Sequence, residues 1–544
     1  MLENTIRSII KNSLDKMGVT DFDDFIIEVP KRSDNGDFAT NVALKLAKII
    51  SKNPREIAEN IVSFIEENDF IEKVEIAGPG FINFFINKKF YEEIVKNILE
   101  NDKYFFLDFG KSKKVLLEFV SANPTGPLHI GHGRGAAYGD TLARLLKVAG
   151  FDVDTEYYIN DAGNQMKMLG DSIYERYKQL VKKKLEELKD GYKGEYIIDI
   201  AKKVLNNYGD LLINDPEKGF DVCFRVGLNE IMDSIKNDLE QFRIIFDRWF
   251  SEKSLFTEGK VDKALEILQK NGYLYEKDGA LWFKSTKFGD EKDRVVKKAD
   301  GSYTYFASDI AYHLDKLNRG YDILIDVWGS DHHGYVSRIK GALKALGDND
   351  DKLTVVLIQM VNLIKEGKRI SMSTRAGEFI SLKWLLDEVG VDAARYFYLM
   401  RDHNAQFDFD IDLAKSKSSD NPVYYVQYAH ARVNSLFENA KLKNITFIQG
   451  ENLDLLSERQ EKELIKKMYE FKKIIKAAAA HFEPHRITYY LQDLAALFHN
   501  YYYNTKIITD DYYVTNARLN LSKAVAITIK FGLSILGVNA PEKM

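Results

Sequence analysis

Apolar residues recur at helical spacing from Leu2 to Leu14, so the chain is predicted to open with an amphipathic helix. The segment 73–86 instead has a strand-like pattern on either side of a Gly-Pro-Gly break, which is typical of two strands joined by a turn. We therefore expect residues 1–110 to form a small α+β domain, which a polar segment separates from the rest of the chain.

At residue 114 the pattern changes to strand, helix and strand. Residues 114–120 are a nearly uninterrupted run of strand-forming residues, as in buried parallel strands. Residues 135–148 have helical spacing that ends at Gly150, and residues 151–159 have a strand pattern again. This order predicts a βαβ unit, the start of a doubly wound parallel sheet.

A second unit of the same kind follows after a long interruption. Strands are predicted at 321–327 and 353–360, with a helix at 334–346 between them. Helical patterns fill much of the interruption. We therefore expect residues 111–390 to form one Rossmann-type α/β domain with a helical insertion at about 171–300.

From residue 391 onward the chain has helical patterns and many tyrosines, 13 of the 30 in the whole sequence. This stretch carries 20 basic and 18 acidic residues, whereas the whole chain has a net charge of −5. A slightly basic, aromatic helical domain is a candidate RNA-binding surface. A tyrosine-rich core is the alternative, which composition alone favours. We expect residues 391–544 to be a helical bundle, which makes the fold class multidomain, α/β and all-α.

Composition limits the class of protein. Hydrophobic residues make up 45% and charged residues 29%, which is typical of a globular enzyme. The only cysteine, Cys223, excludes an internal disulfide and a thiolate zinc cluster and favours a reducing compartment. The sequence has neither an apolar run long enough to cross a membrane nor a signal-peptide core, so we expect a cytoplasmic protein.

Two glycine-rich loops, each directly after a predicted strand, carry the candidate chemistry. The first is 121–135, in which His129-Ile-Gly-His132 leads into a helix. Glycine lets backbone approach a ligand closely, the N-terminal end of a helix attracts phosphate, and both histidines can donate to one phosphate chain. Four of the ten histidines of the chain lie in these two loops, which makes chance a weak alternative.

The second loop, 327–334, contains Asp331 and two histidines between Gly329 and Gly334. Asp331 is expected to bind ribose hydroxyls, as acidic residues do in dinucleotide folds. A metal site is the alternative, but adjacent residues rarely bind one ion together, so we disfavour it. Farther on, the segment 365–377 carries four cations that could neutralise a triphosphate, although a solvated hairpin would have the same composition.

These motifs and their surroundings resemble one family. HIGH at 129–132 and the MSTR segment at 372–375 are similar to the two signature motifs of class I aminoacyl-tRNA synthetases. The longer stretches SANPTGPLHIGHGRGAAYGD, WGSDHHGYVSRIKGAL, VGVDAARYF and NPVYYVQYAHAR resemble arginyl-tRNA synthetases of the bacterial type, and the resemblance extends from about residue 78 to the C-terminus. It implies an N-terminal tRNA-contacting domain, a class I catalytic domain and a helical anticodon-binding domain.

The resemblance also implies a reaction. ATP would activate L-arginine to arginyl-adenylate, and the arginyl group would then pass to the 3′ end of tRNA(Arg), with release of AMP and pyrophosphate. We expect activation to depend on tRNA. Mg²⁺ would arrive with ATP, and we expect a monomer with no protein-bound metal.

By the same resemblance, Asp309 is expected to be the main partner of the substrate guanidinium, because a carboxylate matches this planar group with two hydrogen bonds. The amino-acid pocket would comprise Ser121, Asn123, His132, Tyr305, Asp309 and His333. The ATP-binding residues would be His129, Gly131, His132, Gly133, Gly329, Asp331, Met372 and Ser373. The tRNA contacts would be Phe81 and Asn83 in the N-terminal domain and Tyr424, Tyr425, Tyr428 and Met544 in the C-terminal domain. For each of these tyrosines, packing in a core remains the alternative.

The second signature motif departs from the class pattern. Its two lysine positions are Ser371 and Thr374 here, so neither ammonium group is present. We expect Lys368 to neutralise the leaving pyrophosphate in their place, with Arg375 as the alternative. The candidate catalytic residues are therefore His129, His132, Lys368 and Arg375, and the other nearby cations are Lys365, Arg369 and Arg134.

Other classes fit less well. A nucleotidyltransferase has a similar histidine loop but needs no tyrosine-rich helical tail. A catalytically silent tRNA-binding relative would be expected to lose the histidines or glycines of the first loop, which are present. Synthetases for cysteine or methionine often carry cysteine zinc ligands, and those for glutamate or glutamine would need a cation in place of Asp309.

Overall fold

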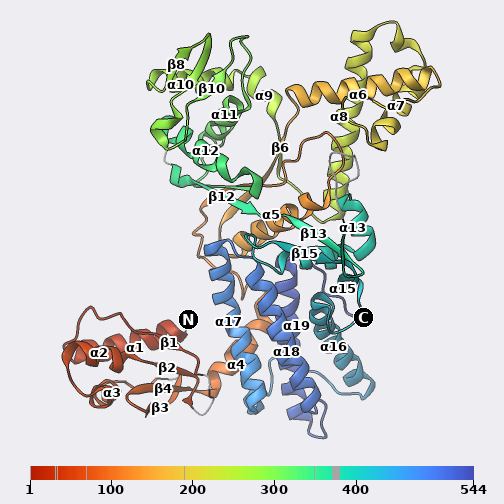
Figure 1. Ribbon diagram of the computed structural model, residues 1–544. Helices are drawn as coiled ribbons and strands as arrows, with labels where there is room; N and C mark the ends of the chain where they lie inside the picture. Colours follow the sequence, from red (N-terminus) through yellow and green to blue (C-terminus); the bar gives the residue numbers. More distant parts are fainter. Residues whose placement is uncertain are drawn as a thin grey trace. The chain divides into compact units, whose positions relative to one another are not determined.

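The structure is a computed structural model that describes residues 2–30, 32, 35–68, 70–188, 190–347, 350–370 and 380–544. It divides into two compact units, each assembled from segments that are distant in the sequence (Figure 1). Unit 1 comprises Met1–Tyr104, Phe437–Tyr469 and Tyr501–Val525, and unit 2 comprises Phe105–Leu436, Glu470–Asn500 and Ala526–Met544.

Unit 1 contains the predicted α+β fold. Its sheet is antiparallel with the strand order β1-β2-β4-β3, and the expected strand pair is β3 and β4. The predicted first helix is α1, whose apolar residues Ile6, Ile10 and Leu14 are buried. The strands are β1 (Ile27–Glu28), β2 (Phe38–Thr40), β3 (Ile71–Ala77) and β4 (Phe81–Ile86), and the helices of this part are α1 (Leu2–Lys16), α2 (Val42–Ile50), α3 (Pro54–Ser63) and α4 (Lys88–Glu100).

Unit 2 is built around a sheet of five parallel strands with the order β12-β11-β5-β6-β7. The two predicted βαβ units are confirmed, with α5 (Ile130–Val148) between β5 and β6 and α12 (His333–Ala345) between β11 and β12. Because the two βαβ units extend from the centre of the sheet toward opposite edges, the topological switch point lies between β5 and β11. The five strands are β5 (Lys114–Glu118), β6 (Asp152–Ile159), β7 (Arg248–Ser251), β11 (Ile323–Gly329) and β12 (Leu353–Ile358).

The segment between the βαβ units is less helical than predicted. Its first half is helical, and α8 begins at Pro216 with Asp215 as a cap that accepts from the N–H of Lys218. However, β7 is an edge strand of the main sheet, and β8, β9 and β10 form a small antiparallel sheet. Four-residue strands have too few positions to establish a period, and β7 pairs only with β6, which is distant in the sequence. The further elements here are α6 (Asn164–Val181), α7 (Glu195–Tyr208), α8 (Pro216–Gln241), α9 (Glu252–Thr257), α10 (Lys260–Lys270), β8 (Leu274–Lys277), β9 (Ala280–Phe283) and β10 (Arg294–Lys297).

Helix α11 (Tyr305–Asn318) leads into β11 and contributes to a buried apolar cluster with α10 and α12. This cluster includes Leu265, Ile310, Leu324 and Leu343. Because α11 is fixed on this core, its polar residues have a rigid support.

The remainder of the chain is mostly helical, as predicted. A further small sheet pairs β13 with β14 in antiparallel and with β15 in parallel orientation. The basic segment 365–377 begins in the hairpin of β13 and β14, but residues 371–379, including Met372, Ser373 and Arg375, lie outside the described residues. Within the described residues, no helix is long and apolar enough to cross a membrane. These elements are β13 (Val361–Lys365), β14 (Lys368–Ile370), α13 (Leu382–Val389), α14 (Val391–Leu399), β15 (Phe407–Asp410), α15 (Ile411–Lys415), α16 (Pro422–Leu442), α17 (Arg459–His481), α18 (His485–Asn504) and α19 (Tyr512–Ile535).

Candidate active site

A cavity of about 650 Å³ lies at the carboxyl ends of β5 and β11. This is the switch point of the sheet, where α/β folds bind ligands. Both predicted loops and α11 contribute to its wall. Of the predicted site residues, the cavity is lined by Ser121, Asn123, His129, Gly131, His132, Tyr305, Asp309, Gly329 and Asp331.

Of the described residues predicted for catalysis or for binding ATP or arginine, His333, Gly133 and Lys368 do not line the cavity. Instead of His333 the structure places His332 there, because a 3₁₀ turn at Ser330–His332 ends before His333 begins α12. Gly133 is buried in α5, where a Cβ atom would lie 2.8 Å from the side chains of Leu382 and Tyr398. Gly133 therefore permits close packing of α5, and ligand approach is left to Gly131.

The two histidines of the first loop form a reciprocal cap at the start of α5. Nδ1 of His129 accepts from the N–H of Gly131 at 3.1 Å, and Nδ1 of His132 accepts from the N–H of His129 at 3.3 Å. A neutral imidazole that accepts through Nδ1 carries its proton on Nε2, so each ring keeps one donor. Burial lowers the pKa of both rings, and with the nearby His129 it lowers the pKa of His132 to about 3. Both histidines are therefore neutral hydrogen-bond donors at neutral pH.

Besides Asp331, three carboxylates line the same cavity: Glu118 at the end of β5, Glu252 at the start of α9 and Asp309 on α11. Burial raises the pKa of Glu252 to about 7 and also raises the pKa of Asp309. Ser308 donates to Glu252 at 3.0 Å, and the Tyr335 hydroxyl donates to Asp309. Partly desolvated carboxylates of this kind suit a cationic ligand.

The backbone is strained where β5 becomes the first loop. Val120 and Ser121 have φ angles of +67° and +41°, a region that a β-branched residue rarely adopts. The Ser121 hydroxyl donates to Glu118 at 2.8 Å and accepts from the N–H of Tyr158 at 3.1 Å. Ser121 thus shapes the cavity by holding Glu118, whereas Asn123 is exposed at the cavity wall.

Sequence reasoning missed two of the carboxylates. Glu118 had a signal, since it is an acidic residue within an apolar strand directly before the first loop. Glu252 had none, because it follows β7, which was itself not predicted. The aromatic part of the wall was also missed: Tyr158, Tyr312, Trp328 and Tyr335.

The cations Arg134, in the first loop, and Lys368, in the segment 365–377, differ in availability. Arg134 is 1% exposed, and its guanidinium donates to the backbone oxygens of Gln359, Asp402 and Ala405 at 2.8–2.9 Å. It therefore holds the loops around α5 together and is not available to neutralise phosphate. Lys368 on β14 is exposed. In the part of the chain that the structure describes, no group of three or more His, Cys, Asp or Glu residues could hold a metal ion.

Comparison with known proteins identifies the family. The model of the class I (R) tRNA synthetase catalytic domain matches residues 94–435, and that of the arginyl tRNA synthetase N terminal domain matches residues 4–86. The chain belongs to the arginyl-tRNA synthetases. The DALR anticodon binding domain matches residues 426–544, which confirms the predicted order of domain types for this synthetase.

Relatives of the synthetase cover nearly its whole length. An arginine–tRNA ligase of Geobacter sp. (strain M21) is 50% identical over 523 residues, which are 95% of this chain and 94% of the relative. An arginine–tRNA ligase of Listeria monocytogenes serovar 1/2a is 49% identical over 529 residues, 96% of this chain and 95% of the relative. The arginyl-tRNA synthetase structure of Thermus thermophilus shares the fold, with a TM-score of 0.76 at 22% identity and full coverage of both chains.

The residues of the synthetase that were predicted to contact tRNA in unit 1 differ in exposure. Phe81 is half-buried on β4. Asn83 is only 4% exposed, because β4 is an inner strand that pairs with β2 and β3. Its side chain is therefore poorly accessible to RNA.

In unit 2 the predicted tRNA contacts lie among stacked rings. Tyr424 and Tyr428 of α16 are nearly parallel, with centroids 6.1 Å apart, and the Arg432 guanidinium lies 4.7 Å from the ring centroid of Tyr428. The ring of Tyr425 lies 4.6 Å from that of His499. Tyr428 is 37% exposed, and so is available for stacking by a base. Met544, at the end of the chain, is 46% exposed.

Proposed function

We propose that the chain is an arginine–tRNA ligase that forms arginyl-adenylate from L-arginine and ATP and transfers the arginyl group to the 3′ end of tRNA(Arg). Relatives of that name with about 50% identity support the overall reaction. The observation that carries the proposal is one cavity lined by both neutral histidine donors and buried carboxylates. This combination suits a polyanionic nucleotide and a cationic amino acid together.

Adenylate formation requires positioning and charge stabilisation. The α-carboxylate of arginine attacks the α-phosphorus of ATP, the bond from that phosphorus to the β-phosphate bridging oxygen breaks, and pyrophosphate leaves. His129 and His132 would donate their Nε2–H groups to phosphate oxygens, with Gly131 allowing close approach. Asp331, next to Gly329, would accept from the ribose hydroxyls. Mg²⁺ would bind through the ATP phosphates, which are ligands that it prefers.

Specificity for arginine would come from the carboxylates. Asp309 would bind the guanidinium, with Tyr305 and Asn123 completing the amino-acid pocket. Glu118 and Glu252 add negative charge to the same wall, which favours the arginine side chain over neutral ones. In the second step a hydroxyl of the terminal tRNA ribose attacks the carbonyl carbon of the adenylate, and AMP leaves.

The remaining assignments extend the proposal beyond the cavity. Lys368, or Arg375 as the alternative, would neutralise the leaving pyrophosphate. Phe81 and the tyrosines of α16 would contact tRNA, and activation would require bound tRNA. We also propose that the chain acts as a monomer in the cytoplasm. Its tRNA substrate is found there, and a single unpaired cysteine fits a reducing compartment.

Amino-acid-dependent ATP–pyrophosphate exchange tests the proposal, measured with each standard amino acid in the presence and absence of tRNA. We expect arginine to be the one amino acid that supports exchange, and we expect this exchange to require tRNA. Charging of other amino acids onto tRNA would contradict the assignment of the pocket. Nucleotide transfer without any amino acid would favour a nucleotidyltransferase.

A further inference from the structure

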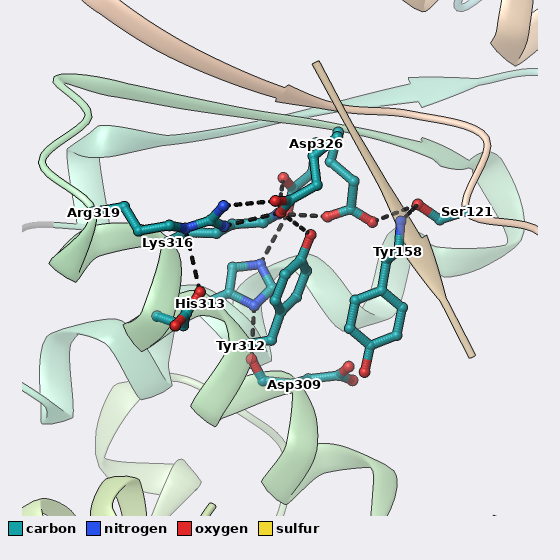
Figure 2. Close-up of polar contacts among 11 residues, drawn as sticks. Ser121, Tyr158, Asp309, Tyr312, His313, Lys316, Arg319 and Asp326 are labelled. Atoms are coloured by element: carbon teal, nitrogen blue, oxygen red, sulfur yellow. Dashed lines mark hydrogen bonds and ion pairs between the residues drawn. The ribbon is translucent and has the colours of Figure 1, made fainter. Parts of the chain in front are cut away.

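A buried polar cluster adjoins the cavity (Figure 2). Lys316 of α11 is fully buried, and its ammonium donates to Glu118 of β5 and, at 2.7 Å, to Asp326 of β11. A buried ammonium is tolerated only when it is paired, so Lys316 depends on both carboxylates. Although burial alone raises the pKa of Asp326, Lys316 and His313 lower it below its ordinary value.

Glu118 joins this cluster to the cavity. It lines the cavity, while one carboxylate oxygen accepts from Lys316 and the other accepts from Ser121 at 2.8 Å. Each oxygen keeps a second lone pair for a further donor. The partners inside the protein therefore fix the orientation of the carboxylate and leave it able to accept from a cationic ligand.

The cluster also reaches the helix turn that carries Asp309. The ring of His313 lies between Asp326, at 2.9 Å from Nε2, and the backbone oxygen of Asp309, at 2.8 Å from Nδ1. Without Lys316, Glu118 would lose the buried ammonium that links it to Asp326 and, through His313, to this turn of α11.

We propose that Lys316 is a positioning residue of the arginine site. Lys316 is not part of the cavity wall and so acts through Glu118, whose carboxylate it holds in place. Glu118 and Asp309 can then face the cationic substrate together. This inference rests on the proposed function, and it requires that loss of Lys316 weakens the use of arginine while leaving the use of ATP intact.

Arg319, which caps the C-terminal end of the same helix, provides a matched control. Its guanidinium donates to the fully buried Glu156 at 2.6 and 2.9 Å, and its own side chain is 16% exposed. Unlike Glu118, Glu156 does not line the cavity. Loss of either cation removes a buried ion pair and destabilises the fold, but only loss of Lys316 releases a carboxylate of the cavity.

The first experiment compares Lys316→Met with Arg319→Met in tRNA-dependent ATP–pyrophosphate exchange and in thermal melting. We expect K316M to raise the arginine KM about tenfold or more with an ATP KM within about twofold of wild type. We expect R319M to change the arginine KM by less than about threefold. Lys316→Arg, which keeps the charge, is expected to recover most of the loss.

A double variant tests whether Lys316 acts through Glu118. In a Glu118→Gln background, K316M is expected to change the arginine KM by less than about twofold, because the carboxylate that it positions is already gone. If K316M is unfolded at the assay temperature, K316M/D326N replaces it, since this pair removes one charge of each sign.

Three results would overturn the inference: equal changes in arginine KM for K316M and R319M, no change for K316M, or a full additional loss in the Glu118→Gln background. If the wild-type chain shows no arginine-dependent exchange, the proposed function fails, and the inference fails with it.

Discussion

At the scale of single residues, we expect different carboxylates of the cavity to recognise the amino acid and the nucleotide. Asp309 accepts from Tyr335 and is the candidate partner of the guanidinium, whereas Asp331 is exposed beside Gly329. We expect Asp309→Asn to weaken the use of arginine by about 2–5 kcal/mol, because it removes a charge-assisted hydrogen bond, and to leave the ATP KM nearly unchanged. Asp331→Asn should have the opposite pattern. Pyrophosphate exchange measures both, and an unaltered arginine KM would remove Asp309 from the pocket.

Also at the residue scale, Glu252 predicts a pH-dependent stability. Burial raises its pKa in the folded chain to about 7, above the ordinary value of 4.5. The folded state therefore binds this proton more tightly than the unfolded state, so the contribution of Glu252 to stability falls as pH rises from about 4.5 to 7. Glu252→Gln should be more stable than wild type at pH 8 by on the order of 3 kcal/mol and should differ little near pH 4.5. Thermal melts of both proteins at the two pH values check this, and an equal difference at both would contradict it.

At the scale of elements, the first turn of α5 places His129 and His132, and its packing depends on Gly133. A Cβ atom at Gly133 would meet two side chains at 2.8 Å, whereas one at Gly135 would meet nothing within 4 Å. We expect Gly133→Ala to cost about 1–3 kcal/mol of stability and to slow single-turnover adenylate formation, because α5 must shift. Gly135→Ala is the control and should be neutral or stabilising by about 0.5–1 kcal/mol. Equal melting temperatures for the two variants would contradict the packing role.

The local sequence pattern was enough to predict those elements whose hydrophobic period or motif lies within their own residues. The βαβ units were predicted because their strands and helices are long enough to show a period, and the histidine loop because its residues are contiguous. The hairpin of β8 and β9 has a sequence signal, the dipeptide Asp278-Gly279, from which the hairpin was not predicted. Both residues have positive φ, 52° and 73°, as a tight hairpin turn requires. The acidic wall was predicted only in part, through Asp309, because Glu118 and Glu252 come from two other elements that only the folded chain brings beside it.

At the scale of the whole molecule, tRNA is expected to contact both units, through Phe81 in unit 1 and Tyr428 in unit 2. Stacking of a base on an exposed ring contributes about 1–3 kcal/mol, so Phe81→Ala and Tyr428→Ala should each raise the KM for tRNA by that equivalent. The arginine KM at saturating tRNA and the melting temperature should stay close to wild type. Asn83→Ala should instead lower stability, because Asn83 is buried.

The double variant then tests whether the two contacts are independent. Residues that share no partner lose free energy additively, within about 0.5 kcal/mol, so Phe81→Ala with Tyr428→Ala should show the sum of the two single losses in the KM for tRNA. Charging of full-length tRNA at varied concentration measures this. A double variant no worse than the more impaired single variant would mean that each contact forms only when the other is present, so that the two units bind tRNA cooperatively. A loss well beyond the sum would mean that either ring can hold tRNA when the other is missing.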